Sequence, residues 1–315
     1  MDVLMLNEAE VRGLLDPEAL LDALADAFRA LSEGRVVAPK RSEVSVPNTG
    51  SLLTMPAYQA GCEITVKLVS VFHGNTQAGL PAHQALVCLF DAQTGTPLSF
   101  MDGTSITALR TAGAAALSTR LLARADSRVL AIIGAGVQGQ AHLHMLSLVR
   151  QFSEIRLASR QLTHAQELAA TDPRVRAFAS AEEAVRRADV VCLCTDAGQP
   201  VISVDWLAPG THVTSVGYRP PGGELDPRIV ERGRVFVETR LAFEPPPAGC
   251  GELAGCDPDI GTELGELLLG QRLGRQSQDE FTVYKSMGHA CEDMAAATLV
   301  YRRAQQEKAG RIVAF

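Results

Sequence analysis

The feature that most constrains this chain is a glycine-rich turn between an apolar run and a helical pattern. Residues 128–133 are largely apolar and predict a buried strand, whereas residues 138–150 have the spacing of a helix. Between them stands the motif Gly134-Ala135-Gly136-Val137-Gln138-Gly139. In a strand–turn–helix unit, the three glycines permit a tight turn, close approach of a pyrophosphate, and close packing of the helix on the strand. The motif therefore predicts a dinucleotide site; the alternative is a glycine turn that binds no nucleotide.

The segments after this motif alternate between strand and helix patterns. Strands are predicted at residues 154–158, 175–178, 189–194, 211–216 and 234–237, and helices at 163–170 and 180–187. Such alternation is typical of parallel α/β sheets. We therefore expect an α/β fold with a Rossmann-type, doubly wound parallel sheet. The stretch 244–261, rich in Pro, Gly and Cys, is expected to be a loop.

The first part of the chain has a different pattern. Residues 7–33 are predicted to be helical, with Asp16 as an N-cap and Pro17 at the first helical position. Further predicted elements are strands at 52–55, 64–71 and 85–90, a helix at 104–123 and a final helix at 287–306. Pro, Gly and Asn turns between the strands indicate an α+β domain with a mostly antiparallel sheet, on which we expect the final helix to pack.

Composition narrows the class of protein. The chain has 315 residues, of which 46% are hydrophobic and 21% are charged, which suits a globular protein of two domains. No apolar run reaches the roughly 20 residues of a membrane-spanning helix. No basic segment precedes an apolar one at the start, so we expect a soluble protein without a secretory signal. The net charge of −7 is spread along the chain, and nucleic acid is therefore not an expected partner.

Seven cysteines cannot pair completely within one chain. Cys192 and Cys194 alternate along a predicted strand and would share one face of it. Cys250 and Cys256 lack the close-spaced partners of a zinc site. We therefore expect reduced thiols in a cytoplasmic protein and no metal site.

The choice of cofactor depends on the end of the second predicted strand of the Rossmann-type domain. An acidic residue there binds the ribose hydroxyl of NAD and repels the phosphate of NADP. This chain has Ser159 and Arg160 instead, which can hydrogen-bond and neutralise a phosphate. NADP(H) is therefore favoured over NAD(H). The alternative for Arg160 is an ordinary solvated surface charge.

Three cations precede this domain in segments that are predicted to be structured. Arg41 follows Pro39-Lys40, Lys67 lies in the strand pattern 64–71, and Arg110 lies in the helical pattern 104–123. Lys67 and Arg110 have mostly apolar neighbours, and a buried cation requires an anionic partner. A substrate carboxylate could be that partner. For any one of the three, a structural ion pair or an exposed position is the more common outcome.

With these residues in view, the chain resembles the ornithine cyclodeaminase/mu-crystallin family over essentially its whole length. The matching stretches are Pro39-Lys40-Arg41, Met55-Pro56-Ala57-Tyr58, Val66-Lys67-Leu68-Val69, Leu80-Pro81-Ala82-His83-Gln84-Ala85, Met101-Asp102-Gly103, Thr107-Ala108-Leu109-Arg110-Thr111-Ala112, the glycine motif, Ala208-Pro209-Gly210-Thr211-His212, Ser215-Val216-Gly217, Glu224-Leu225-Asp226 and Thr282-Val283-Tyr284-Lys285-Ser286-Met287-Gly288. The Leu-Pro-x-His-Gln stretch followed by Met-Asp-Gly is more similar to mu-crystallin-type ketimine reductases than to ornithine cyclodeaminases.

The resemblance implies a subunit of two domains. Residues 1–118 with 290–315 would form a substrate-binding and dimerisation domain, and residues 119–289 the Rossmann dinucleotide-binding domain. The family is usually dimeric, so a homodimer is expected, with the active site in the cleft between the domains of a subunit.

The resemblance also implies roles for single residues. Arg41, Lys67 and Arg110 would hold the carboxylate of an amino or imino acid, with Lys67 and Arg110 as catalytic residues. His83 and Met287 would lie near the substrate, although a structural role for His83 is equally compatible with the sequence. The implied neighbours of the cofactor are Gln84, Thr111, Gly134, Gly136, Val137, Gln138, Gly139, Ser159, Arg160, Thr195, Val216, Gly217 and Ser286.

One position departs from part of the family. Ornithine cyclodeaminases carry an Asp two residues after a Val-Gly pair, where it activates water or a substrate amine. In this chain Arg219 stands two residues after Val216-Gly217. Arginine stays protonated and cannot act as a general base. The departure disfavours cyclodeamination and favours the reduction of a preformed imine.

Three functions remain open at this point. The leading hypothesis is NAD(P)H-dependent hydride transfer to a 2-imino acid, such as the cyclic ketimines pyrroline-2-carboxylate and piperideine-2-carboxylate. The first alternative is ornithine cyclodeamination or dehydrogenation of an open-chain amino acid such as alanine. The second is a non-enzymatic, nucleotide-dependent protein that binds small molecules. The retained cations beside a full dinucleotide motif make this last hypothesis the least favoured.

Overall fold

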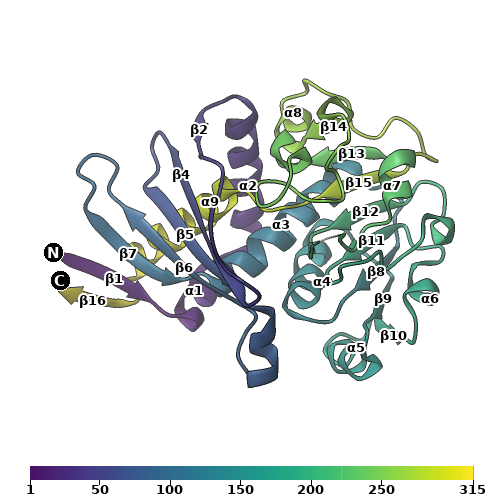
Figure 1. Ribbon diagram of the computed structural model, residues 1–315, viewed down its shortest axis with the longest axis horizontal. Helices are drawn as coiled ribbons and strands as arrows, with labels where there is room; N and C mark the ends of the chain where they lie inside the picture. Colours follow the sequence, from purple (N-terminus) through teal and green to yellow (C-terminus); the bar gives the residue numbers. More distant parts are fainter. Residues whose placement is uncertain (221, 315) are drawn as a thin grey trace. The chain divides into compact units, whose positions relative to one another are not determined.

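The computed structural model describes residues 1–220 and 222–314 (Figure 1). The chain divides into two compact units, Met1–Arg110 with His289–Phe315 and Thr111–Gly288, and the division falls inside helix α3 (Thr104–Leu122). The domain boundaries at residues 118 and 290 stay predictions. Within the described ranges, no helix has the length and apolar character that a membrane crossing requires.

The first unit is built on a mainly antiparallel sheet with the strand order β16-β1-β7-β6-β5-β4-β2, in which β3 also pairs with β4. Only β1 and β7 pair in parallel among its described strands. The strands are β1 (Asp2–Leu6), β2 (Val36–Val37), β3 (Ser42–Val46), β4 (Gly50–Gln59), β5 (Ile64–Val71), β6 (His83–Phe90), β7 (Pro97–Asp102) and β16 (Arg311–Ala314). The predicted antiparallel sheet is confirmed, while β1, β2, β3, β7 and β16 were not predicted.

The helices of this unit are α1 (Glu8–Leu14), α2 (Pro17–Ser32) and α9 (Ala290–Glu307), with a 3-10 turn η1 (His73–Ala78). The predicted helix at 7–33 is two helices, because the backbone is extended at Leu15. Asp16 caps α2 by accepting a hydrogen bond from the Ala19 amide, as predicted. The C-terminal helix α9 packs against α2 and strands β4 and β5, which confirms the predicted return of the chain (Figure 1).

The second unit is built on a parallel sheet with the strand order β10-β9-β8-β11-β12-β15-β13-β14. Its strands are β8 (Val129–Ile133), β9 (Glu154–Ala158), β10 (Val175–Phe178), β11 (Val190–Leu193), β12 (His212–Ser215), β13 (Arg234–Val237), β14 (Gly261–Glu263) and β15 (Thr282–Lys285). Its further elements are α4 (Val137–Val149), α5 (Leu162–Ala169), α6 (Ala181–Val185), α7 (Pro227–Arg232), α8 (Leu264–Leu268) and the 3-10 turns η2 (Val204–Trp206), η3 (Arg240–Phe243) and η4 (Pro258–Ile260).

This order is that of a doubly wound sheet, so the predicted Rossmann-type α/β fold is confirmed. From the central strand β8 the chain runs outward through β9 to β10, and it then returns to the other side of β8 through β11 and β12. Ligands of such sheets bind beyond the carboxyl ends of the strands, where the direction of winding reverses. That point lies between β8 and β11.

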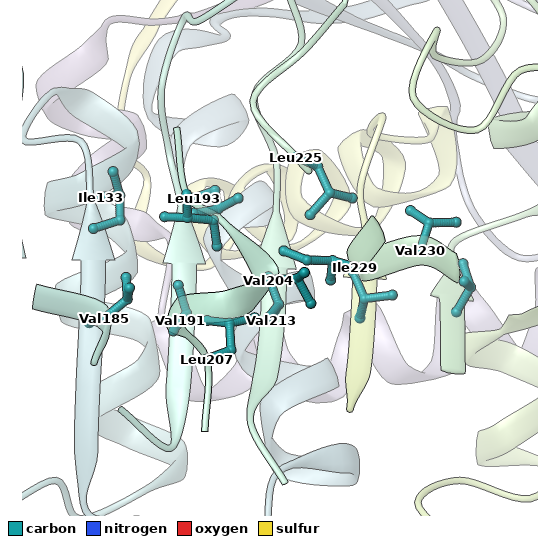
Figure 2. Close-up of a cluster of buried hydrophobic side chains, with 14 of the residues drawn as sticks. Ile133, Val185, Val191, Leu193, Val204, Leu207, Val213, Leu225, Ile229 and Val230 are labelled. Carbon is teal, nitrogen blue, oxygen red and sulfur yellow. The ribbon is translucent and has the colours of Figure 1, made fainter. Parts of the chain in front are cut away.

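The core of the second unit is formed by apolar side chains of these central strands and of the segments that cover them. Figure 2 shows Ile133, Leu193 and Val213 from three strands together with Val204 and Ile229 from the covering turn and helix. All five are at most 4% exposed. The rigid sheet that results holds the strand ends, and the loops that follow them, in fixed positions.

Candidate functional site

The glycine motif lies in the turn from β8 to α4, at the point where the winding reverses. Gly134 has φ = +113°, which is a conformation that favours glycine, and a Cβ there would overlap the carbonyl of Cys194. A Cβ at Gly139 would overlap the carbonyl of Gly134. The protein's own packing therefore requires both of these glycines.

Gly136 is different, because a Cβ there would meet no protein atom within 4 Å and its φ of −82° is open to any residue. Gly136 is the N-cap of α4, and no side chain caps this helix. The amides at the start of α4 and the space beside Gly136 therefore suit a phosphate that approaches the backbone closely. Val137 is exposed and Gln138 is half-buried at the same turn.

At the end of the neighbouring strand β9, Ser159 is half-buried and Arg160 is exposed. Arg160 makes no ion pair with any residue of the described ranges. Its guanidinium is thus available to an anion from solution.

A buried carboxylate holds the loops after β11 and β12. Glu224 Oε2 accepts hydrogen bonds from the backbone amide of Thr195 at 2.6 Å and from its hydroxyl at 2.7 Å. Glu224 Oε1 accepts from the amides of Val216 at 3.1 Å and Gly217 at 2.7 Å, and from the hydroxyl of Ser215 at 3.0 Å. Burial raises the pKa of Glu224, and the nearby Lys285 and these hydrogen bonds oppose the rise. Three of the predicted cofactor neighbours, Thr195, Val216 and Gly217, are therefore fixed by one side chain.

Lys285, at the end of β15, offsets the negative charge of the Glu224 carboxylate. Its Nζ lies 3.1 Å from Ser215 Oγ, 2.7 Å from the carbonyl of Gly217 and 2.5 Å from Glu252 Oε2. An ammonium group has three N–H donors. All three have an acceptor here, so this buried lysine is fully satisfied within the protein.

A second buried carboxylate, Glu238, follows β13 and holds the loop after β15. It accepts hydrogen bonds from the hydroxyl of Ser286 at 2.5 Å and from the amides of Met287 at 3.3 Å and Gly288 at 3.1 Å. Ser286 is buried and Met287 is half-buried. The two residues predicted near the ligands in this loop thus have a fixed backbone.

The cations of the first unit lie around the start of α9. Lys67 is on the buried face of β5, between Met55 of β4 and Val87 of β6, and it is 1% exposed. Its Nζ lies 2.8 Å from Oδ1 and 2.7 Å from Oδ2 of Asp293 in the first turn of α9. Asp293 is the only residue of the described ranges with which Lys67 forms a hydrogen bond. With the two oxygens of Asp293 as its acceptors, Lys67 keeps one of its three N–H donors for a ligand, in contrast to Lys285.

Arg110 joins the same cluster. Its Nε donates to Asp293 Oδ1 at 3.0 Å, and its Nη1 donates to Glu292 Oε2 at 3.2 Å. Burial raises the pKa of Asp293, but Arg110 and Lys67 lower it, so that the pKa lies below its usual value. The half-buried Arg41 adds a smaller lowering effect. These five side chains carry three positive and two negative charges when ionised.

Burial lowers the pKa of Lys67 from 10.5 to about 8, and Arg110 adds to the fall, while Asp293 and Glu292 oppose it. Lys67 is therefore mainly protonated at pH 7, but its proton is much more easily released than that of an exposed lysine. The cluster can bind an acid group and can hold a transferable proton.

The remaining predicted residues occupy varied positions. His83 and Gln84 begin β6 and are exposed, and the His83 ring meets that of His73 edge-on at 6.2 Å between centroids. Thr111 is buried in α3. Arg219 is half exposed and forms an ion pair with Asp196 at 3.6 Å.

Sequence reasoning missed the acidic partners of these cations. Asp293 and Glu292 had a local signal, since an acidic pair follows His289 at the start of a predicted helix. Glu224 was noticed only within a matching stretch, and Glu252 and Glu238 carried no signal in the sequence. Each is defined by contacts between segments distant along the chain.

The chain is similar to known proteins over nearly all of its length. A sequence model described as "Ornithine cyclodeaminase/mu-crystallin family" matches residues 1–308. The ketimine reductase mu-crystallin of Mus musculus is 37% identical over 304 residues, which cover 94% of this chain and 96% of that protein.

Two solved structures are similar in fold as well as in sequence. Thermococcus litoralis Delta(1)-pyrroline-2-carboxylate reductase in complex with NADH and L-proline has a TM-score of 0.91 and 30% identity, over 98% of this chain and 99% of that chain. An archaeal alanine dehydrogenase dimer with bound NAD has a TM-score of 0.90 and 30% identity, with both chains covered completely at 100%.

Proposed function

Because the chain belongs to the ornithine cyclodeaminase/mu-crystallin family, we propose that it is a nicotinamide-dependent oxidoreductase that reduces the C=N bond of a 2-imino acid to an amine. The proposed substrates are cyclic ketimines such as pyrroline-2-carboxylate and piperideine-2-carboxylate. The observation that carries the proposal is the contrast between two buried lysines. Lys285 has three acceptors from three residues, whereas both acceptors of Lys67 belong to Asp293 and one of its donors remains.

The second unit supplies the features that a dinucleotide needs. Gly134 and Gly139 are required by the fold, but Gly136 faces open space at the start of α4. That space suits the pyrophosphate of the dinucleotide. Ser159 and Arg160, in place of an acidic residue at the end of β9, favour NADP(H) over NAD(H).

The first unit supplies the groups that bind an acid. Arg110 and Lys67 are ordered by Asp293, so little side-chain freedom is lost when they bind a carboxylate. Arg41 adds a third positive charge. A carboxylate ligand would balance the remaining positive charge of the cluster, which favours anionic substrates over neutral amines.

The residues have separate roles in the proposed reduction. A bound reduced nicotinamide would supply the hydride that the imine carbon needs. Lys67 and Arg110 hold the adjacent acid group through charge-assisted hydrogen bonds. The imine nitrogen takes up one proton, and Lys67, with its pKa near 8, carries a proton that it can give at neutral pH.

A second candidate is the oxidation of an open-chain amino acid, and it is favoured by the similarity to alanine dehydrogenase. It uses the same acid-binding cations and the same cofactor. Cyclodeamination of ornithine is less well supported, because the exposed Arg219 stands where cyclodeaminases carry an Asp.

We further propose that two copies of the chain associate through the sheet of the first unit. Val44, Leu52 and Leu86 lie on β3, β4 and β6, where the pairing register places them on one face of the sheet, and they are 66%, 40% and 39% exposed. Helix α9 packs on the opposite face of this sheet, where Lys67 points. An exposed apolar sheet face of this kind favours association.

The test is a panel of substrates with both reduced cofactors, followed by the loss of nicotinamide absorbance. We expect turnover of cyclic 2-imino acids, with NADPH preferred, and little oxidation of ornithine. In the variant Arg160→Ser, we expect the KM for NADPH to rise about 10-fold while that for NADH changes little. Turnover of alanine with NAD⁺ but of no cyclic imine would favour the second candidate. No turnover of any acid, despite tight cofactor binding, would refute both.

A further inference from the structure

The sheet alone does not fix the position of the Lys67 ammonium group. Its cross-strand neighbours Met55 and Val87 are apolar and buried, so they offer the ammonium group no acceptor. The charged groups that face it come from other elements: Asp293 and Glu292 from α9, Arg110 from α3, and Arg41 from the segment before β3 through its effect on Asp293. Among them, Asp293 is the one that contacts both Lys67 and Arg110.

Asp293 is itself held firmly. His289 caps α9 by accepting from the amide of Cys291 at 3.2 Å, and Glu292 accepts from the amide of His289 at 2.5 Å. This capping box fixes the first turn, in which Asp293 lies. The start of a helix also favours a negative charge. Asp293 is therefore a fixed anion that both Lys67 and Arg110 contact.

We propose that Asp293 is the positioning residue of this cluster: it fixes Lys67 and Arg110 side by side and keeps Lys67 charged for an acid group. It contacts both cations directly and acts on the substrate only through them. The inference rests on the proposed function for its purpose. The orientation and charge of Lys67 can nevertheless be measured without any turnover.

The charges around Lys67 predict the direction in which its pKa changes when Asp293 is replaced. Burial and Arg110 lower the pKa of Lys67, and Asp293 is the largest effect that raises it. Asp293→Asn keeps the shape of the side chain but removes its charge. The pKa of Lys67 should then fall further below about 8, and a neutral amine would replace the ammonium group at pH 7.

The experiment uses the full chain with ¹³C-labelled lysine, since its four lysines give a simple spectrum. The Lys67 signal is assigned by its loss in Lys67→Met. The Lys67 signal is then followed as the pH is varied. We expect the midpoint of this titration to lie lower by about one pH unit or more in Asp293→Asn than in the wild type. The matched control is Glu292→Gln, which removes a neighbouring carboxylate that contacts Arg110; the Lys67 midpoint should move less in this variant.

Kinetics then separates positioning from a purely structural role. For Asp293→Asn, we expect kcat/KM for the imino acid to fall about 100-fold at pH 7. The alkaline limb of the pH profile of kcat/KM should move to lower pH. The dissociation constant for NADPH should stay within about twofold of the wild-type value. A stable Asp293→Asn variant with an unchanged Lys67 midpoint and pH profile would overturn the proposal.

A measurement on the wild type covers the case in which Asp293→Asn does not fold. A buried ammonium group held by a carboxylate should exchange its protons with water much more slowly than the exposed Lys40 and Lys308. Exchange of Lys67 as fast as that of the exposed lysines would contradict the proposal. If Lys67 behaves as expected but no imino acid is reduced, the proposed function fails and the role of Asp293 in the cluster stands.

Discussion

At the scale of single residues, the two buried lysines show how the same side chain can serve structure or a ligand. Lys285 bridges Ser215, Gly217 and Glu252, and so it joins strand ends within the second unit. Lys67 is equally buried but hydrogen-bonds only to Asp293 among the described residues. A buried cation with an unused donor is unfavourable unless something supplies an acceptor. The environment of Lys67 is therefore one that a ligand would stabilise.

The first prediction concerns this lysine. Lys67→Met retains the length of the side chain among apolar neighbours but removes its charge and its donors. We expect kcat/KM for a cyclic 2-imino acid to fall at least ~100-fold, because an acid-binding and proton-carrying group is lost. The affinity for NADPH, measured by fluorescence titration, should change less than about twofold. Lys308→Met, at an exposed position, is the control and should keep full activity. Wild-type turnover in Lys67→Met would refute the assignment.

The second prediction concerns a buried histidine of α4. The Nδ1 of His142 lies 2.8 Å from the carbonyl of Gln138, whereas its Nε2 is buried and has no hydrogen-bond partner among the described residues. Burial lowers the pKa of His142 from 6.5 to about 4. The unfolded chain therefore binds a proton near pH 6.5 that the folded chain does not bind until about pH 4, so the folded state loses stability as the pH falls through this window.

His142→Phe should remove this contribution. We expect the Tm of the variant to fall less steeply than that of the wild type between pH 6.5 and 4.5, when both are followed by circular dichroism. The buried His212, whose pKa is lowered to about 3 mainly by burial, remains in both proteins and contributes the same slope to each. Equal slopes in the two proteins would show that His142 is not protonated on acid unfolding.

At the scale of elements, the turn from β8 to α4 combines glycines that serve the fold with one that serves a ligand. Gly139 brings the helix against the strand, because a Cβ there would overlap the carbonyl of Gly134. Gly136 faces open space at the uncapped start of α4. Next to this turn, Glu224 ties the loops after β11 and β12 into one rigid edge. The edge is thus built from rigid backbone, which suits the binding of a long dinucleotide.

The third prediction separates the two kinds of glycine. Gly136→Ala should keep the Tm within about 2 °C, since its Cβ meets no protein atom, but should weaken NADPH binding about 10-fold by filling the phosphate space. Gly139→Ala should lower the Tm by several degrees, because α4 has to move away from β8. Thermal unfolding without cofactor and NADPH titration provide the two measurements. Unchanged NADPH affinity in Gly136→Ala would contradict the proposed position of the pyrophosphate.

At the scale of the whole molecule, the two units differ in how their sheets are covered. The parallel sheet of the second unit has strands that are buried along most of their length, as β11 and β12 show. The sheet of the first unit packs one face on α9, and its other face exposes apolar side chains of β3, β4 and β6. Such a surface is unusual for a protein that stays monomeric.

The fourth prediction follows from that face. The paired residues Val44 and Leu52 lie opposite each other on β3 and β4. The double variant Val44→Asp/Leu52→Asp should be a folded monomer, whereas the wild type should be a dimer, because the charges would be desolvated on association. Light scattering after size-exclusion chromatography measures the mass. Leu273→Asp, at a residue of the second unit that is 68% exposed, is the control and should stay dimeric. A monomeric wild type would refute the interface.

Much of the second unit could be predicted because its signals are local. The strand, glycine turn and helix at 128–150 follow one another directly, and the alternation of strands and helices continues from there. Strand β15 was missed, since four buried residues without alternation carry too little pattern. Strands β1 and β16 were also missed, because each is defined by pairing with a partner from the other end of the chain.

The sequence by itself determined the glycine turn, the cap of α2 and the kinds of side chain available for acid binding, because these depend on neighbours within a few residues. Only the tertiary structure decided what each buried charge contacts. Lys67 and Asp293 are 226 residues apart, and no local pattern pairs them. The physical reason is that a buried charge is stabilised by whichever groups the fold brings within hydrogen-bond distance, and that distance is set by the packing of α9 on the sheet.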